Sequence, residues 1–181
     1  MTNRLRKLVW IFSNLRHVAE PHILNNVYKA LAESIITYCI SVWGGCAKTK
    51  LITLERAQRL IIKVMYFKKK RFSTHELHKS SKLLTIRQLY ILRCILRRHT
   101  STPHSQLTQT RRTIRNIITT TVSKTSFARN QYQSRSAYLY NSLNRILKFH
   151  SLTYFNCKTH ISQWLGTHTY DSTEALLNSM I

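Results

Sequence analysis

Two-metal phosphoryl transfer and glycoside hydrolysis both need two or three carboxylates at one point. The 181-residue chain has six acids, which are Glu20, Glu33, Glu55, Glu76, Asp171 and Glu174. No two have the spacing of a catalytic motif, and Asp171 with Glu174 fits the acidic start of a helix. We therefore expect no polymerase, nuclease or other enzymatic activity from this chain alone.

Cysteine and histidine supply the second set of reactive side chains. The cysteines are Cys39, Cys46, Cys94 and Cys157. Their spacing matches neither a disulfide framework nor paired zinc knuckles, which predicts reduced thiols in an intracellular protein. Cys157 with His160 and His168 comes nearest to a zinc-binding set, but it lacks a second close cysteine. We expect no metal site and no cofactor, and the other histidines are scattered along the chain.

Positive charge dominates the composition. Lys and Arg total 29 against six acids, which gives a formal net charge of +23. A field of that sign favours a polyanionic partner such as DNA, RNA or an RNA–DNA hybrid. The candidate phosphate contacts are Arg56, Arg59, Lys63, Lys68, Lys69, Lys70, Arg71, Arg97 and Arg98. Tyr66 and Phe67 beside the lysine run are candidates for stacking on bases. The alternative is that the cations line solvated helix faces.

Helices are needed to position these side chains, and the apolar spacing predicts them. The spacing of apolar residues from Leu5 to Leu15 predicts a first helix that ends near 17–20, before Pro21, where a second begins. The second is apolar nearly all round over 35–43, which predicts burial, and Gly44 ends it. Most aromatic side chains on these and later apolar faces are expected in the core, and they are Trp10, Phe12, Tyr28, Tyr38, Trp43, Tyr90 and Trp164.

A third helix is expected from Leu51 onward. Its apolar seam consists of Leu51, Leu54, Ile61 and Met65. Arg56, Arg59 and Lys63 fall in a narrow arc on the opposite side, which gives a basic stripe. A cationic loop over 68–71 follows, and then a helix over 83–99 that has a basic end.

The composition shifts abruptly after residue 99, because 13 of residues 100–126 are Ser or Thr. Either a solvated linker or a short β-hairpin fits this segment. Two short helices over 138–149 and 157–165 should follow. The predicted class is mainly α, with a helical bundle over 1–99, a Ser/Thr-rich connection over 100–130, a small helical module over 131–169 and a frayed tail over 170–181.

Four motifs occur in an order that points to one family. They are Tyr38-Cys39-Ile40-Ser41-Val42-Trp43-Gly44, Leu54 with Gln58-Arg59, Leu83-Leu84 with Ile86 and Leu89-Tyr90, and Tyr140-Asn141-Ser142-Leu143. This pattern resembles the C-terminal region of LINE-type, jockey-like non-LTR retrotransposon reverse transcriptases, and it covers most of residues 4–165. Tyr140 and Asn144 depart from the Trp and Pro that this family has at the matching positions.

The resemblance implies a helical thumb and connection that grip template-primer nucleic acid in an RNA-directed DNA polymerase. The family's catalytic aspartates lie in a palm domain upstream of anything present here, so the activity does not carry over, and Mg²⁺ would belong to that missing palm. The expected partners are RNA, DNA or RNA–DNA hybrid and the palm itself. Such a chain is a fragment of a transposable element, expected in the nucleus or cytoplasm.

Two other function classes remain open from the sequence. The first 19 residues are Arg-rich, acid-free and amphipathic, which also suits the cleaved presequence of a small basic RNA-binding or ribosome-associated mitochondrial protein. Basic amphipathic helices also bind anionic lipid surfaces. No apolar run approaches the roughly 18 residues of a membrane span, so we expect no membrane-spanning segment.

Overall fold

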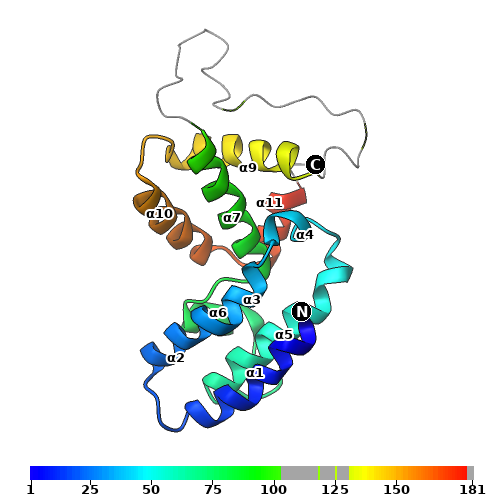
Figure 1. Ribbon diagram of the computed structural model, residues 1–181, viewed down its shortest axis with the longest axis vertical. Coiled ribbons are helices and arrows are strands. Elements are labelled where there is room, and N and C mark those ends of the chain that lie inside the picture. Colours follow the sequence, from blue (N-terminus) through cyan, green and yellow to red (C-terminus); the bar gives the residue numbers. More distant parts are fainter. Residues whose placement is uncertain (103–117, 119–124, 126–130, 179–181) are drawn as a thin grey trace. The chain divides into compact units, whose positions relative to one another are not determined.

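The computed structural model describes residues 1–102, 118, 125 and 131–178, and over these residues the chain is mainly helical, as predicted (Figure 1). The chain divides into two compact units, Met1–Ile86 (unit 1) and Arg87–Ile181 (unit 2). The helix that we placed at the end of the first bundle therefore belongs almost wholly to unit 2. The predicted hairpin or linker over 100–130 lies almost entirely outside the described residues.

Unit 1 contains two long helices. Four shorter helical segments lie between them along the chain, and one more follows the second long helix. The elements are α1 (Thr2–Leu15), α2 (Pro21–Tyr28), the π-helical turn η1 (Lys29–Glu33), α3 (Ser34–Thr37), α4 (Ile40–Trp43), α5 (Lys48–Met65) and α6 (Thr74–Ser81). Helix α1 packs beside α5 (Figure 1). The core contains Leu5 and Phe12 from α1, Tyr28 from α2 and Ile61 from α5. The predicted seam of α5 is buried along its whole length.

The predicted buried helix over 35–43 is wrong in part. Cys39 has a left-handed backbone, φ 51°, which separates α3 from α4. The Trp43 indole donates a hydrogen bond of 2.8 Å to the Tyr38 carbonyl, which gives a partner to a backbone acceptor at the break. Tyr38 and Val42 are 71% and 77% exposed, so the apolar segment does not run through the core as expected. Trp10 is also exposed rather than buried.

The described residues of unit 2 form four helices around its core. They are α7 (Ile86–Ser101), α9 (Tyr132–Leu147), α10 (Tyr154–Thr167) and α11 (Tyr170–Asn178). Helices α9 and α10 begin earlier than the apolar spacing indicates. Tyr90, Tyr140 and Phe149 are among the largest side chains in the core.

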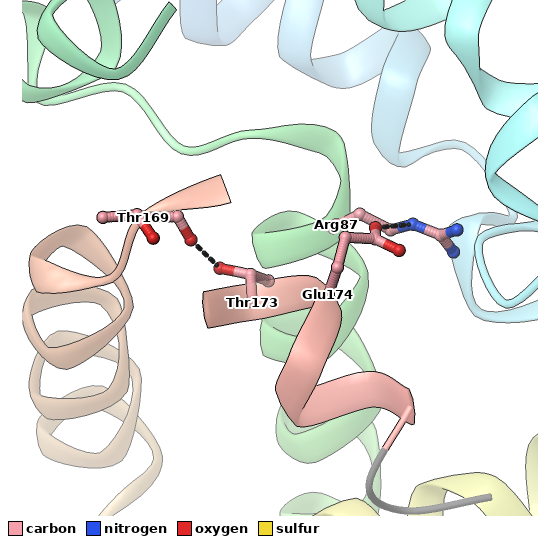
Figure 2. A network of polar contacts seen from close by, with 4 residues as sticks. All are labelled: Arg87, Thr169, Thr173 and Glu174. Atoms are coloured by element: carbon pink, nitrogen blue, oxygen red, sulfur yellow. Dashed lines mark hydrogen bonds and ion pairs between the residues drawn. The ribbon is translucent and has the colours of Figure 1, made fainter. Parts of the chain in front are cut away.

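The predicted frayed tail is wrong, because residues 170–178 form α11. Thr169 caps the helix by accepting a hydrogen bond from the Ser172 backbone N–H at 3.1 Å. Thr173 Oγ1 donates to the Thr169 carbonyl at 2.8 Å, and Arg87 Nε lies 2.6 Å from Glu174 Oε1 (Figure 2). Buried Leu177 completes the attachment. A capped helix with a buried ion pair replaces the expected loose end.

No helix in residues 1–102 and 131–178 is both long enough and apolar enough to cross a bilayer.

Candidate nucleic-acid interface

The loop between α5 and α6 folds back along the basic stripe of α5. Lys63 Nζ donates to the Lys70 carbonyl at 2.6 Å, and Arg59 donates to Thr74 Oγ1 at 3.1 Å. These bonds bring together two clusters that the sequence presents separately. The combined basic surface consists of Arg56, Arg59, Lys63, Lys68, Lys69, Lys70 and Arg71.

Cations on this surface repel one another with few acids nearby. Residues 56–82 include nine Lys or Arg and one acid, Glu76. Partial burial lowers the pKa of Lys63, and the Arg59 guanidinium lowers it further. The loop side chains of 68–71 and Arg56 are exposed. Repulsion between neighbouring cations is relieved by a bound polyanion, so this surface is suited to phosphate groups.

The direction of the loop is set by how α5 ends. Phe67 adopts a left-handed backbone, φ 52°. The Lys68 N–H donates to the Lys63 carbonyl at 2.8 Å, and the Phe67 N–H donates to the Val64 carbonyl at 3.4 Å. This pair of bonds is the Schellman motif, in which the left-handed position is usually glycine. The reversal turns the lysine run back toward the face that carries Arg59 and Lys63.

The two predicted stacking residues have different environments. Tyr66 is half-buried and its hydroxyl donates to Asn25 Oδ1 at 2.8 Å, which ties the end of α5 to α2. Burial raises the pKa of Tyr66. Phe67 is 59% exposed. Tyr66 therefore serves the fold, and Phe67 is the ring that solvent reaches.

Arg16 and His17 are neighbours of Phe67 that sequence reasoning missed. The Arg16 guanidinium carbon lies 4.3 Å from the centre of the Phe67 ring, and the His17 ring lies 5.3 Å from it, edge-on. Arg16 also donates to the Val64 carbonyl at 3.1 Å. These residues are separated from Phe67 by about fifty positions, and no local pattern in the sequence connects them.

The two predicted contacts at the end of α7 lie in unit 2 and differ from each other. Arg98 donates to Ser136 Oγ at 3.0 Å and to the Gln133 carbonyl at 2.8 Å, so it joins α7 to α9. Arg97 is exposed, and its guanidinium lies 4.9 Å from the centre of the Tyr132 ring. Arg97 is thus the more accessible of the two.

Two histidines that appear scattered in the sequence meet in the core of unit 2. His99 Nδ1 lies 3.0 Å from the Tyr140 hydroxyl, which lies 2.8 Å from His150 Nδ1. His99 Nε2 lies 2.8 Å from the Leu152 carbonyl. All three rings are buried, which indicates a polar core network. The separation of these residues along the chain hides the network from sequence analysis.

The nearest candidate for a zinc site was Cys157 with His160 and His168. Cys157 is buried, and burial raises the pKa of its thiol to about 11, whereas His160 is exposed. Across residues 1–102 and 131–178, no group of three or more His, Cys, Asp or Glu side chains is arranged to hold a metal ion.

Comparison with known proteins adds no relative to these observations. No protein-family model, curated protein or solved structure matches this chain.

Proposed function

We propose that this chain binds nucleic acid through the basic surface of unit 1, as the thumb and connection region of a LINE-type reverse transcriptase would, without a chemical step of its own. The observation that carries the proposal is the joining of the α5 stripe to the 68–71 loop by the Lys63–Lys70 and Arg59–Thr74 hydrogen bonds. Seven cations thereby share one surface, where the sequence gives two separate clusters.

The arrangement supports backbone contact rather than base reading. Arg56, Arg59 and Lys63 are spaced along about 10 Å of a helix, at 1.5 Å per residue. A rigid helix with cations at intervals of that order holds phosphates without distinguishing bases. The proposed partner is therefore a template-primer duplex, and an RNA–DNA hybrid is the form that the family resemblance implies.

Two of the four motifs that resemble the family contribute buried residues to the fold. Gln58 of the second motif is buried and donates to Tyr28 and to the Leu84 carbonyl, so it organises the unit that carries the basic surface. Leu89 and Tyr90 of the third motif lie in the core of unit 2. These roles are those of a scaffold, and they agree with a thumb that supports rather than catalyses.

Fluorescence anisotropy of the full chain tests the proposal, with labelled RNA–DNA hybrid, duplex DNA, single strands and heparin over a salt series. We expect hybrid or duplex to bind most tightly, with an affinity that falls steeply as salt rises, because each phosphate contact contributes about 0.9 to the salt slope. Binding that is absent, or equal for every polyanion including heparin, would contradict the proposal.

A matched pair of variants locates the surface. Changing Lys68, Lys69, Lys70 and Arg71 to Gln should lower the salt slope by about 3.6 if each contacts one phosphate. The control has the same loss of charge from four exposed, dispersed cations, namely Arg4, Lys29, Arg93 and Lys158. Equal losses in the two variants would show that net charge, and not this surface, determines binding.

The mitochondrial alternative makes a different prediction about α1. Leu5 and Phe12 are fully buried in the core of unit 1. N-terminal sequencing of the expressed protein distinguishes the two functions, because import would remove residues up to about 20 and with them both core side chains. An intact α1 is expected if unit 1 acts as proposed.

A further inference from the structure

Phe67 occupies a backbone conformation that its side chain does not favour. Its φ of 52° lies in the left-handed region, at the position of the Schellman motif where glycine fits without strain. The residue remains 59% exposed, so burial compensates little of that strain. Strained residues of this kind gather at functional sites. The environment of the ring indicates which function.

The ring is partly covered by cationic and aromatic neighbours. Arg16 lies over it at 4.3 Å and His17 lies edge-on at 5.3 Å. Arg16 Nε donates a hydrogen bond of 3.3 Å to His17 Nε2, so the two neighbours of the ring also contact each other. The remaining surface of Phe67 is open, and the anchoring of Arg16 on the Val64 carbonyl fixes the guanidinium in place.

We propose that Phe67, supported by Arg16, is a stacking platform for an unpaired base of the nucleic acid that the basic surface holds. The inference rests on the proposed function, since Lys68 follows Phe67 directly and the run to Arg71 supplies the phosphate contacts. An aromatic ring beside cations binds a strand by stacking on one base while the cations hold the backbone. The guanidinium over the ring adds a charge that also attracts the phosphate.

The open ring selects unpaired bases for a geometric reason. Inside a duplex both faces of each base are already stacked on neighbours, and a protein ring reaches them only by unstacking a base step, which costs a few kcal/mol. A single-stranded extension or an unpaired end offers a free base face. We therefore expect the platform to prefer a duplex with a single-stranded overhang over the same duplex with a blunt end.

The test uses the full chain and two labelled RNA–DNA hybrids, identical except that the overhang of one lacks its bases. Both hybrids present the same phosphates, so their difference in affinity reports stacking alone. The wild-type chain should bind the hybrid with bases about tenfold more tightly. Phe67→Gly should remove this preference and leave the affinity for the abasic hybrid and the salt slope unchanged. DNA and RNA overhangs in parallel show which strand is preferred.

Phe67→Gly removes the aromatic ring and keeps a residue that favours the left-handed backbone. It therefore tests the ring without changing the turn. Glycine is the favoured residue at this position, so the variant should unfold at the same temperature as wild type or higher. Phe67→Asn, which also tolerates the left-handed region, repeats the test. Phe155→Ala is the control, because Phe155 is 74% exposed but lies in unit 2.

The outcomes distinguish this inference from the proposed function. If Phe67→Gly retains the preference for bases, or weakens both hybrids equally, the platform is wrong while salt-dependent binding through the basic surface stands. If the wild-type chain binds neither hybrid, both the proposed function and the platform are wrong. Loss of the preference in Phe67→Gly and Phe67→Asn, with Phe155→Ala unchanged, supports the platform.

Discussion

The side-chain amide of Gln58 in α5 donates a hydrogen bond to the Tyr28 hydroxyl of α2 at 3.0 Å, and both residues are buried. The same nitrogen donates to the Leu84 carbonyl at 2.9 Å. One amide thus connects three segments of unit 1 and provides partners for groups that are removed from water. The arrangement explains why a polar side chain lies in the apolar seam of α5.

Gln58→Leu should destabilise unit 1 by about 3 kcal/mol, because it leaves the Tyr28 hydroxyl and the Leu84 carbonyl with an apolar neighbour. Urea unfolding measures the change. Tyr28→Phe alone should cost less, since Gln58 keeps its bond to Leu84. The double variant should be more stable than the sum of the single losses predicts, by about 1 kcal/mol. Strict additivity would show that the two side chains do not interact.

The existence of α1 and α5 was predictable from local signals, but their ends were not, because α1 ends at Leu15 rather than near 17–20 and α5 begins at Lys48 rather than Leu51. Pro21 limits the first helix, and the spacing of Leu51, Leu54, Ile61 and Met65 defines the third. The left-handed residues Cys39 and Phe67 were not, since neither is a glycine or asparagine that would signal such a backbone. The Cys39 break is accompanied by the local Trp43–Tyr38 bond, and the turn at Phe67 by a contact with Arg16, which is distant in the sequence.

The candidate interface was likewise predictable from the sequence only in part. Charge counting along the sequence finds the lysine run and the stripe of α5, because cations are visible in any sequence. Their union depends on the Lys63–Lys70 bond, which forms across the left-handed turn at Phe67, and no glycine or asparagine in the sequence signals that turn. Residues 170–178 were expected to fray because chain termini are often poorly ordered, and the structure attaches them through the Arg87–Glu174 pair.

His78 should make unit 1 less stable in mild acid. Burial lowers the pKa of His78 below its usual 6.5, the nearby Arg59 adds to the effect, and a hydrogen bond with the Leu83 carbonyl opposes it. The unfolded chain then binds more protons below about pH 6.5, so stability is complete above that value and falls as the pH drops through it. Thermal unfolding between pH 5 and pH 7.5 measures this loss.

His78→Asn is the control for the pH effect. The Asn amide can replace the Nδ1–H donor toward Leu83 without titrating. The variant should unfold at a temperature that changes less between pH 5 and pH 7.5 than that of wild type. An identical pH profile in the two proteins would assign the acid sensitivity to another group.

The Arg87–Glu174 pair should be essential for α11. The two side chains are 5% and 13% exposed, so removing one charge takes a close opposite charge away from a buried group. Glu174→Gln should cost about 3 kcal/mol, whereas replacing both residues together with Met and Leu should be close to neutral. Hydrogen exchange of residues 170–178 follows the helix directly. Unchanged protection in Glu174→Gln would show that Thr169 and Leu177 hold α11 without the ion pair.

The buried network around Tyr140 should fix the tautomers of both its histidines. The Leu152 carbonyl only accepts, so His99 carries its proton on Nε2 and its neutral Nδ1 accepts from the Tyr140 hydroxyl. Tyr140 has then used its proton, and His150 must donate from Nδ1 at 2.8 Å. Nitrogen NMR shifts of the two rings should report these different tautomers. Tyr140→Phe removes the link between them and should cost about 2 kcal/mol in urea unfolding, because two ring nitrogens lose their shared partner. The same tautomer on both rings would contradict the proposed direction of the bonds.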